Sequence, residues 1–149
     1  MEPGLRARNV DATYFGQCQP NRQQAKLLRG GHVFTTTDFI AQDEANIEDL
    51  VGADLYIDVV NEAYNLKAGN KLKAKSVSAL MPETPRVVLK VEAAFKVMPD
   101  GVPEFNHYSP SAWLIQNPAT LKREAAAVLA ALDRFEAMFV DLNKLLPAH

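Results

Sequence analysis

Acidic side chains gather in one stretch of the sequence, from Asp38 to Leu50. The stretch holds five carboxylates, and no Lys or Arg occurs between Gly30 and Leu66. Proteins bind Mg²⁺ through one or two carboxylates together with water and substrate phosphates, so this stretch is a candidate source of metal ligands. The same carboxylates could instead cap helix N-termini, where negative charge is favourable, or face solvent. They are Asp38, Asp43, Glu44, Glu48 and Asp49.

Glu48 and Asp49 are neighbours in the sequence. Successive side chains on a helix diverge by about 100°, so the two carboxylates would not normally bind one ion together. We therefore expect one of them to face a ligand and the other to cap a helix or face solvent.

Motifs for other kinds of chemistry are missing. The sequence has no Gly-rich phosphate loop with Lys-Ser/Thr and no G-x-S-x-G, and its three histidines are scattered. Cys18 is the single cysteine, which excludes an internal disulfide and a cysteine-based zinc site. Four lysines lie between Lys67 and Lys75. They indicate either a solvated loop or contact with nucleic-acid phosphates, through Lys71, Lys73 and Lys75.

Composition favours an ordinary globular protein with one domain. The chain has 149 residues, of which 48% are hydrophobic and 23% charged, and a net charge of -2. This balance gives no support to a wholly basic nucleic-acid binder. No apolar run is long enough to span a bilayer, and the N-terminus lacks the apolar core of a signal peptide. We expect a cytoplasmic protein without membrane contact.

The first half of the chain predicts an α/β arrangement. Residues 1–22 read as irregular, and 23–29 as a helix that ends at Gly30-Gly31. The β-branched and aromatic run from His32 to Thr37 predicts a buried strand, with Asp38 just beyond its carboxyl end, where ligands bind in open α/β sheets. A helix from Leu55 to about Asn65 follows, with Asp54 as its N-cap, and 67–83 form a basic linker.

The second half is expected to be helical. Thr84-Pro85 opens a helix from Arg86 to about Val97, and Ser111–Ile115 is a short helical segment. Asn117-Pro118 then opens a long helix over about 119–146. Its apolar residues recur at steps of four and three, which suits either a core-facing helix or a dimerisation seam. They are Leu121, Ala125, Val128, Leu132, Phe135, Phe139, Leu142 and Leu146. The predicted fold class is α/β, predominantly helical.

Five short motifs are spread along the chain: Thr36–Phe39, Asn46–Leu50, Leu55–Tyr64, Glu104–Leu114 and Leu132–Asn143. Together they resemble the C-terminal part of the TOPRIM nuclease region in OLD-like ATP-dependent endonucleases, a family associated with phage defence. The resemblance implies a partial TOPRIM-like strand-helix unit over 23–66 and a C-terminal helical part over 84–147. It also implies cleavage of DNA with two divalent metals, Mg²⁺ or Mn²⁺.

The resemblance assigns roles to individual residues. Glu48 matches the downstream acidic metal ligand of the family, and Asp49 is a candidate to assist it. Asp38, just beyond the predicted strand, is a further candidate ligand. Lys90 is the candidate counterpart of a lysine that stabilises transition-state charge.

The chain also departs from the family pattern. It contains no Asp-x-Asp, no early glutamate strand and no ATPase motif. We therefore expect a fragment that holds one carboxylate of a multi-ligand site, is inactive alone, and works with an ATPase-bearing partner chain or as a homodimer. The alternative is a small non-catalytic interaction module that forms a homodimer through the 121–146 stripe.

Overall fold

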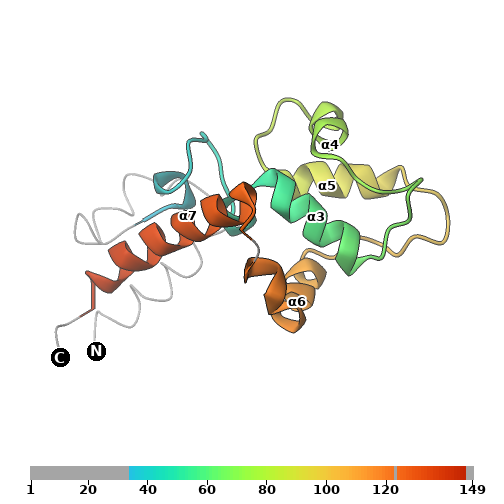
Figure 1. Ribbon diagram of the computed structural model, residues 1–149. Coiled ribbons are helices and arrows are strands. Elements are labelled where there is room, and N and C mark those ends of the chain that lie inside the picture. The colour runs from blue at the N-terminus through green and yellow to red at the C-terminus, as the bar shows by residue number, and fades with distance from the viewer. Residues whose placement is uncertain (1–33, 123, 147–149) are drawn as a thin grey trace, which may run out of the picture.

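A computed structural model describes residues 34–122 and 124–146, and within these ranges the chain is predominantly helical (Figure 1). The helical part of the predicted fold class is thus confirmed. The described elements, in chain order, are the 3₁₀ helix η1 (Thr36–Asp38), α2 (Ile47–Val51), α3 (Ala53–Ala63), α4 (Ala74–Leu80), α5 (Val87–Lys96), α6 (Tyr108–Gln116), the 3₁₀ helix η2 (Pro118–Lys122) and α7 (Ala126–Asn143).

Helix α3 is the centre of the core, because it is buried on two sides. One side packs on α4 and α5, and the other packs on the N-terminal half of α7. In Figure 1, α4 and α5 lie together above α3, and α7 extends to the left, away from them. The first cluster contains Tyr56, Ile57, Val60, Val77, Val87, Val88, Val91 and Ala94. The second contains Leu55, Val59, Val128 and Ala131.

The predicted strand over 32–37 is wrong where the structure describes it. Phe34 and Thr35 are irregular, and Thr36 begins η1. The buried Thr36 hydroxyl donates to the Ala45 carbonyl, and the Asp38 carboxylate accepts from the Thr35 N–H at 2.7 Å. Such local side-chain bonds compete with strand pairing. No strand occurs in 34–122 or 124–146, so these ranges give no support to a TOPRIM-like sheet.

The predicted basic linker over 67–83 contains a helix that was not predicted from the sequence. Helix α4 begins at Ala74, and its Val77 is 1% exposed and part of the core. The turn before it is fastened by Asn61, whose side chain accepts from the Leu72 N–H at 2.8 Å and donates to the Leu72 carbonyl at 3.0 Å. This short helix could not be predicted from apolar periodicity, because Val77 is its one buried side chain.

Helix ends also differ from the predictions. Helix α3 begins one residue before Asp54, and Gly52 is its N-cap with φ +86°. Thr84 does accept a hydrogen bond, at 3.2 Å from the Arg86 N–H, and α5 starts at Val87. The segment 111–115 is part of the longer α6, whose first turn is fastened by the Asn106 side chain accepting from the Tyr108 N–H at 2.9 Å.

The predicted long helix over 119–146 is divided into η2 and the later α7. The expectations for 1–22 and 23–29, like His32, Val33 and Cys18, lie outside the described residues. Within the described part of the chain, no helix has the length and apolarity needed to cross a bilayer.

Arg134 of α7 binds the C-terminal end of α2. Its Nε donates to the Leu50 carbonyl at 2.7 Å, and its Nη2 lies 3.4 Å from the Val51 carbonyl. These carbonyls end a helix and have no partner within it, so a cation there satisfies them. Gly52 permits the contact, because a Cβ at this position would lie 2.8 Å from Nη2.

Replacing this guanidinium should destabilise the fold. Arg134→Met keeps an apolar stem and removes the donors to α2. Hydrogen bonds to charged groups contribute about 1.5–3 kcal/mol, so we expect the free energy of unfolding to fall by about that amount in urea titrations. Lys144→Met is the control, because Lys144 makes an exposed ion pair with Asp141, and such pairs contribute about 0–1 kcal/mol. Equal losses in the two variants would contradict a special role for Arg134.

Candidate functional site

Two of the predicted metal ligands are helix-capping residues. Asp38 accepts from the Thr35 N–H at 2.7 Å and from the Thr35 hydroxyl at 3.2 Å, at the start of η1. Asp49 Oδ2 accepts from the Asn46 N–H at 2.6 Å, at the start of α2. In both, an acid at the third helical position bonds the backbone N–H of the N-cap residue, as in a capping box. The capping alternative for the acidic stretch therefore accounts for both residues.

Asp49 caps a second helix as well. Its Oδ1 accepts from the N–H of Val87, the first residue of α5, at 2.7 Å. Asp49 is 3% exposed, and this burial raises the pKa of its carboxyl group above the ordinary value of 3.8. The Val87 and Asn46 N–H groups and the positive charges of Arg86 and Lys90 act in the opposite direction. Both carboxylate oxygens are thus engaged in holding helices.

Glu48 has a different environment from its neighbour. It lines a cavity of about 120 Å³ between α2, α3, α6 and α7. Among the described residues its carboxylate makes no hydrogen bond or ion pair, and its side chain is partly exposed. The walls of this cavity are Ile47, Glu48, Val51, Tyr56, Val59, Pro110, Ser111, Leu114 and Phe135.

Tyr56, one of the residues that line this cavity, carries a buried hydroxyl. Tyr56 is 3% exposed, and within the described part of the chain its buried hydroxyl has no hydrogen-bond partner. Burial raises the pKa of this phenol, and the negative charge of Glu48 raises it further. The hydroxyl is therefore a neutral donor with an unused hydrogen-bonding capacity.

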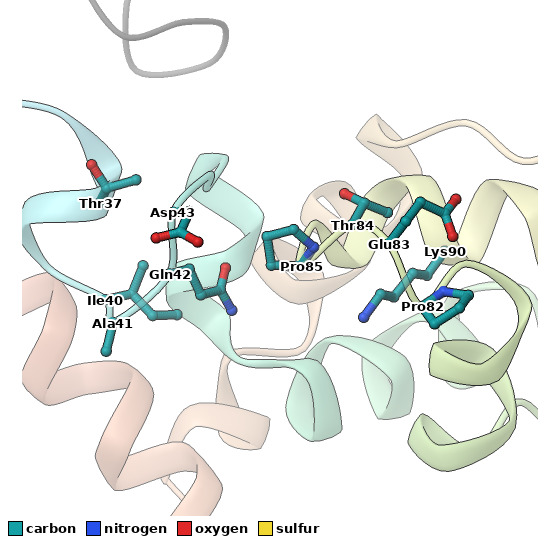
Figure 2. A pocket seen from close by; sticks show the side chains of 10 residues that line it. All are labelled: Thr37, Ile40, Ala41, Gln42, Asp43, Pro82, Glu83, Thr84, Pro85 and Lys90. Atoms are coloured by element: carbon teal, nitrogen blue, oxygen red, sulfur yellow. The ribbon is translucent and has the colours of Figure 1, made fainter.

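Lys90 lines a separate groove of about 630 Å³, between the 37–43 segment and the 82–90 segment (Figure 2). Figure 2 shows the Lys90 amine directed into the groove, with Gln42 on the opposite wall. The Gln42 Oε1 atom is buried and has no hydrogen-bond partner among the described residues. Asp43 and Glu83 also line the groove. Its mixed charges suit a polar ligand but do not make a dedicated phosphate site.

The three lysines predicted to bind nucleic acid are all exposed. Lys71 lies 3.9 Å from the Glu62 carboxylate, and Lys73 precedes α4 as its N-cap residue. Lys75 is in the first turn of α4. Lys71 and Lys73 share a hollow of about 360 Å³ with Asp58 and Glu62. These acids reduce the positive potential that would attract phosphates.

The structure does not bring all of the predicted site residues into one place, although Lys90 is near enough to Asp49 for its charge to act on that carboxyl group. Glu48, Lys90 and the Lys71–Lys73 pair line three different hollows. In residues 34–122 and 124–146, no group of three or more His, Cys, Asp or Glu is placed to hold a metal ion. The described residues alone therefore do not provide a ligand set for Mg²⁺ or Mn²⁺, and metal binding stays a prediction.

The Tyr56 hydroxyl and the Arg134 contact were not predicted from the sequence. Tyr56 lies in the predicted helix over 55–65 and belongs to the core cluster with α4 and α5. Neither an unpartnered hydroxyl nor a bond spanning 84 residues leaves a signal in the sequence. Only the packing of α2 against α3 and α7 reveals them.

Asp49→Asn tests the double cap and its pH dependence. The amide NH₂ of Asn cannot accept, so one buried backbone N–H loses its partner, at a cost of about 1–3 kcal/mol. Because the folded-state pKa is raised, stability from Asp49 is complete below about pH 3.8 and declines as pH rises through the raised pKa. We therefore expect the stability gap between wild type and Asp49→Asn to narrow from acid to neutral pH in urea titrations.

Asp100→Asn, a change in an exposed turn, is the matched control and should stay within about 0.5 kcal/mol of wild type. A gap that widens toward neutral pH would instead mean that the two hydrogen bonds outweigh burial and lower the pKa of Asp49.

Comparisons with protein-family models, curated proteins and solved structures find no match to this chain.

Proposed function

We propose that this chain is the C-terminal helical part of an OLD-like TOPRIM DNA endonuclease of the phage-defence type, inactive by itself, with Glu48 as its contribution to a metal site. One observation supports the choice of Glu48. Within the Asn46–Leu50 motif, both oxygens of Asp49 are bonded to backbone N–H groups, whereas Glu48 is partly exposed and has no partner among the described residues. Glu48 is therefore the carboxylate of this motif that is left for a ligand.

Contacts between the motifs give further support. Leu50 of the Asn46–Leu50 motif is bonded to Arg134 of the Leu132–Asn143 motif. Tyr64, which ends the Leu55–Tyr64 motif, accepts from the Asn106 N–H at 2.6 Å and lies 3.1 Å from the Asn106 carbonyl. These contacts join four of the five motifs in two pairs, as a shared fold requires.

The remaining ligands would come from outside the described residues, for example from an ATPase-bearing partner chain. When bound, divalent ions in such sites activate water and stabilise the leaving oxygen. Lys90, in the groove in Figure 2, remains the candidate for stabilising transition-state charge. Lys71, Lys73 and Lys75, on the surface beside α4, remain candidates for contact with DNA.

A second candidate function is a non-catalytic interaction module. One observation favours it: α7 and the turn after it carry five exposed large apolar side chains. Exposed apolar patches often mark protein-binding surfaces. This candidate does not require any of the missing metal ligands.

Glu48→Gln tests the first candidate with Mn²⁺ as the probe. A paramagnetic ion bound near Glu48 broadens the NMR signals of α2, and removing the carboxylate charge should abolish this broadening. The isolated wild-type chain should show weak Mn²⁺ binding and no cleavage of plasmid DNA in Mg²⁺ or Mn²⁺.

Glu44→Gln is the matched control, because Glu44 lies in the same acidic stretch but is exposed and outside the motif. It should leave the broadening of α2 unchanged. Broadening that survives in Glu48→Gln, or strong cleavage by the isolated chain, would contradict the proposal.

A further inference from the structure

The groove in Figure 2 has opposite charges on its two walls. One wall is the 37–43 segment, which contributes Asp43, and the other is the 82–90 segment, which contributes Lys90. Glu83 belongs to the second wall, but Figure 2 shows its carboxylate directed away from the Lys90 amine. Lys90 forms no ion pair with either acid, so the charges of Lys90 and Asp43 stay separated by the groove.

Two side chains that point into this groove from opposite walls have unused hydrogen-bonding groups. Lys90 is half-buried, and among the described residues its amine makes neither a hydrogen bond nor an ion pair. Gln42 projects toward it from the other wall, and the buried Oε1 atom of Gln42 has no partner in the described part of the chain. Buried polar atoms are nearly always hydrogen-bonded in folded proteins, so both groups are available to a ligand.

The size and charge of the groove restrict the class of ligand. Its volume of about 630 Å³ lies within the range of small-molecule sites, about 300–1,000 Å³. Asp43 and Glu83 outnumber the single lysine, so a phosphate group with two negative charges would be repelled overall. A ligand with one carboxylate and one ammonium group matches both walls. In a free amino acid both groups sit on one carbon atom, whereas each further residue of a peptide separates them by up to about 3.3–3.6 Å.

We propose that the groove binds a short peptide by both of its charged ends. The terminal carboxylate of the peptide pairs with the Lys90 amine, and its N-terminal ammonium pairs with the Asp43 carboxylate. A main-chain N–H between the two ends donates to Oε1 of Gln42. Capture of a charged peptide end is one of the recurring modes of peptide recognition. This binding goes beyond the proposed nuclease function and requires neither metal nor DNA.

Titration of the isotope-labelled chain with glycylglycine, followed by NMR, tests the proposal. The dipeptide should shift the amide signals of both groove walls, in residues 37–43 and 82–90. N-acetylglycylglycine lacks the ammonium group and glycylglycinamide lacks the carboxylate. Each should bind roughly tenfold more weakly, because one hydrogen bond between charged groups is lost. Glycine should also bind more weakly than the dipeptide, since its two charges cannot be spread across the groove.

Two variants test the groove side chains separately. Lys90→Met keeps the aliphatic stem and removes the positive charge, and Gln42→Leu removes the amide. Both change partly exposed side chains, so the fold should be retained. We expect the affinity for glycylglycine to fall roughly tenfold or more in Lys90→Met and severalfold in Gln42→Leu. Lys96→Met is the matched control and should bind as wild type does, because Lys96 is on the same helix but is exposed and does not line the groove.

Three results would overturn the proposal: no shifts with glycylglycine, equal affinity for the dipeptide and its two blocked derivatives, or unchanged affinity in Lys90→Met. Tighter binding of inorganic phosphate than of glycylglycine would also overturn it, and would favour the transition-state role of Lys90. Glu48 does not line this groove, so the outcome is independent of the Mn²⁺ test.

Discussion

The carboxylate of Asp49 accepts hydrogen bonds from the first turns of two helices, at the Asn46 and Val87 N–H groups. This arrangement matters because α2 has only five residues and could not persist alone in water. Asp49 fastens its N-terminal end to α5, and Arg134 of α7 binds the carbonyls at its C-terminal end. A helix of one and a half turns thus connects the two core clusters on either side of α3.

The orientation of Glu48 follows from the position of Asp49. Because neighbouring side chains on a helix diverge by about 100°, burial of Asp49 against α5 directs Glu48 toward the cavity between α3, α6 and α7. The sequence predicted that one of these two acids would face a ligand and the other would cap a helix or face solvent, and Asp49 caps. It could not predict which residue took which role, since that depends on where α5 lies.

Periodic helices were predicted well, and segments governed by particular contacts were not. The helix predicted from Leu55 and the helix predicted after Thr84-Pro85 match α3 and α5 within a few residues. The Thr35–Thr37 run has high strand propensity. In the structure, Thr35 and Thr36 instead make local hydrogen bonds to Asp38 and Ala45, and a 3₁₀ helix begins at Thr36. The stripe over 121–146 was a continuous pattern in the sequence, yet the helix begins only at Ala126, and half of the stripe stays exposed.

One buried carboxylate caps α2 and α5 together, and amide hydrogen exchange of the two capped N–H groups tests this arrangement. If Asp49 holds both helices, the Asn46 and Val87 N–H groups are covered by its carboxylate and open only when the helices separate. Their exchange should therefore be slow, with a free energy of opening close to that of global unfolding, and should accelerate strongly in Asp49→Asn. Exchange of both amides at the rate of exposed loop amides in the wild-type chain would contradict the claim.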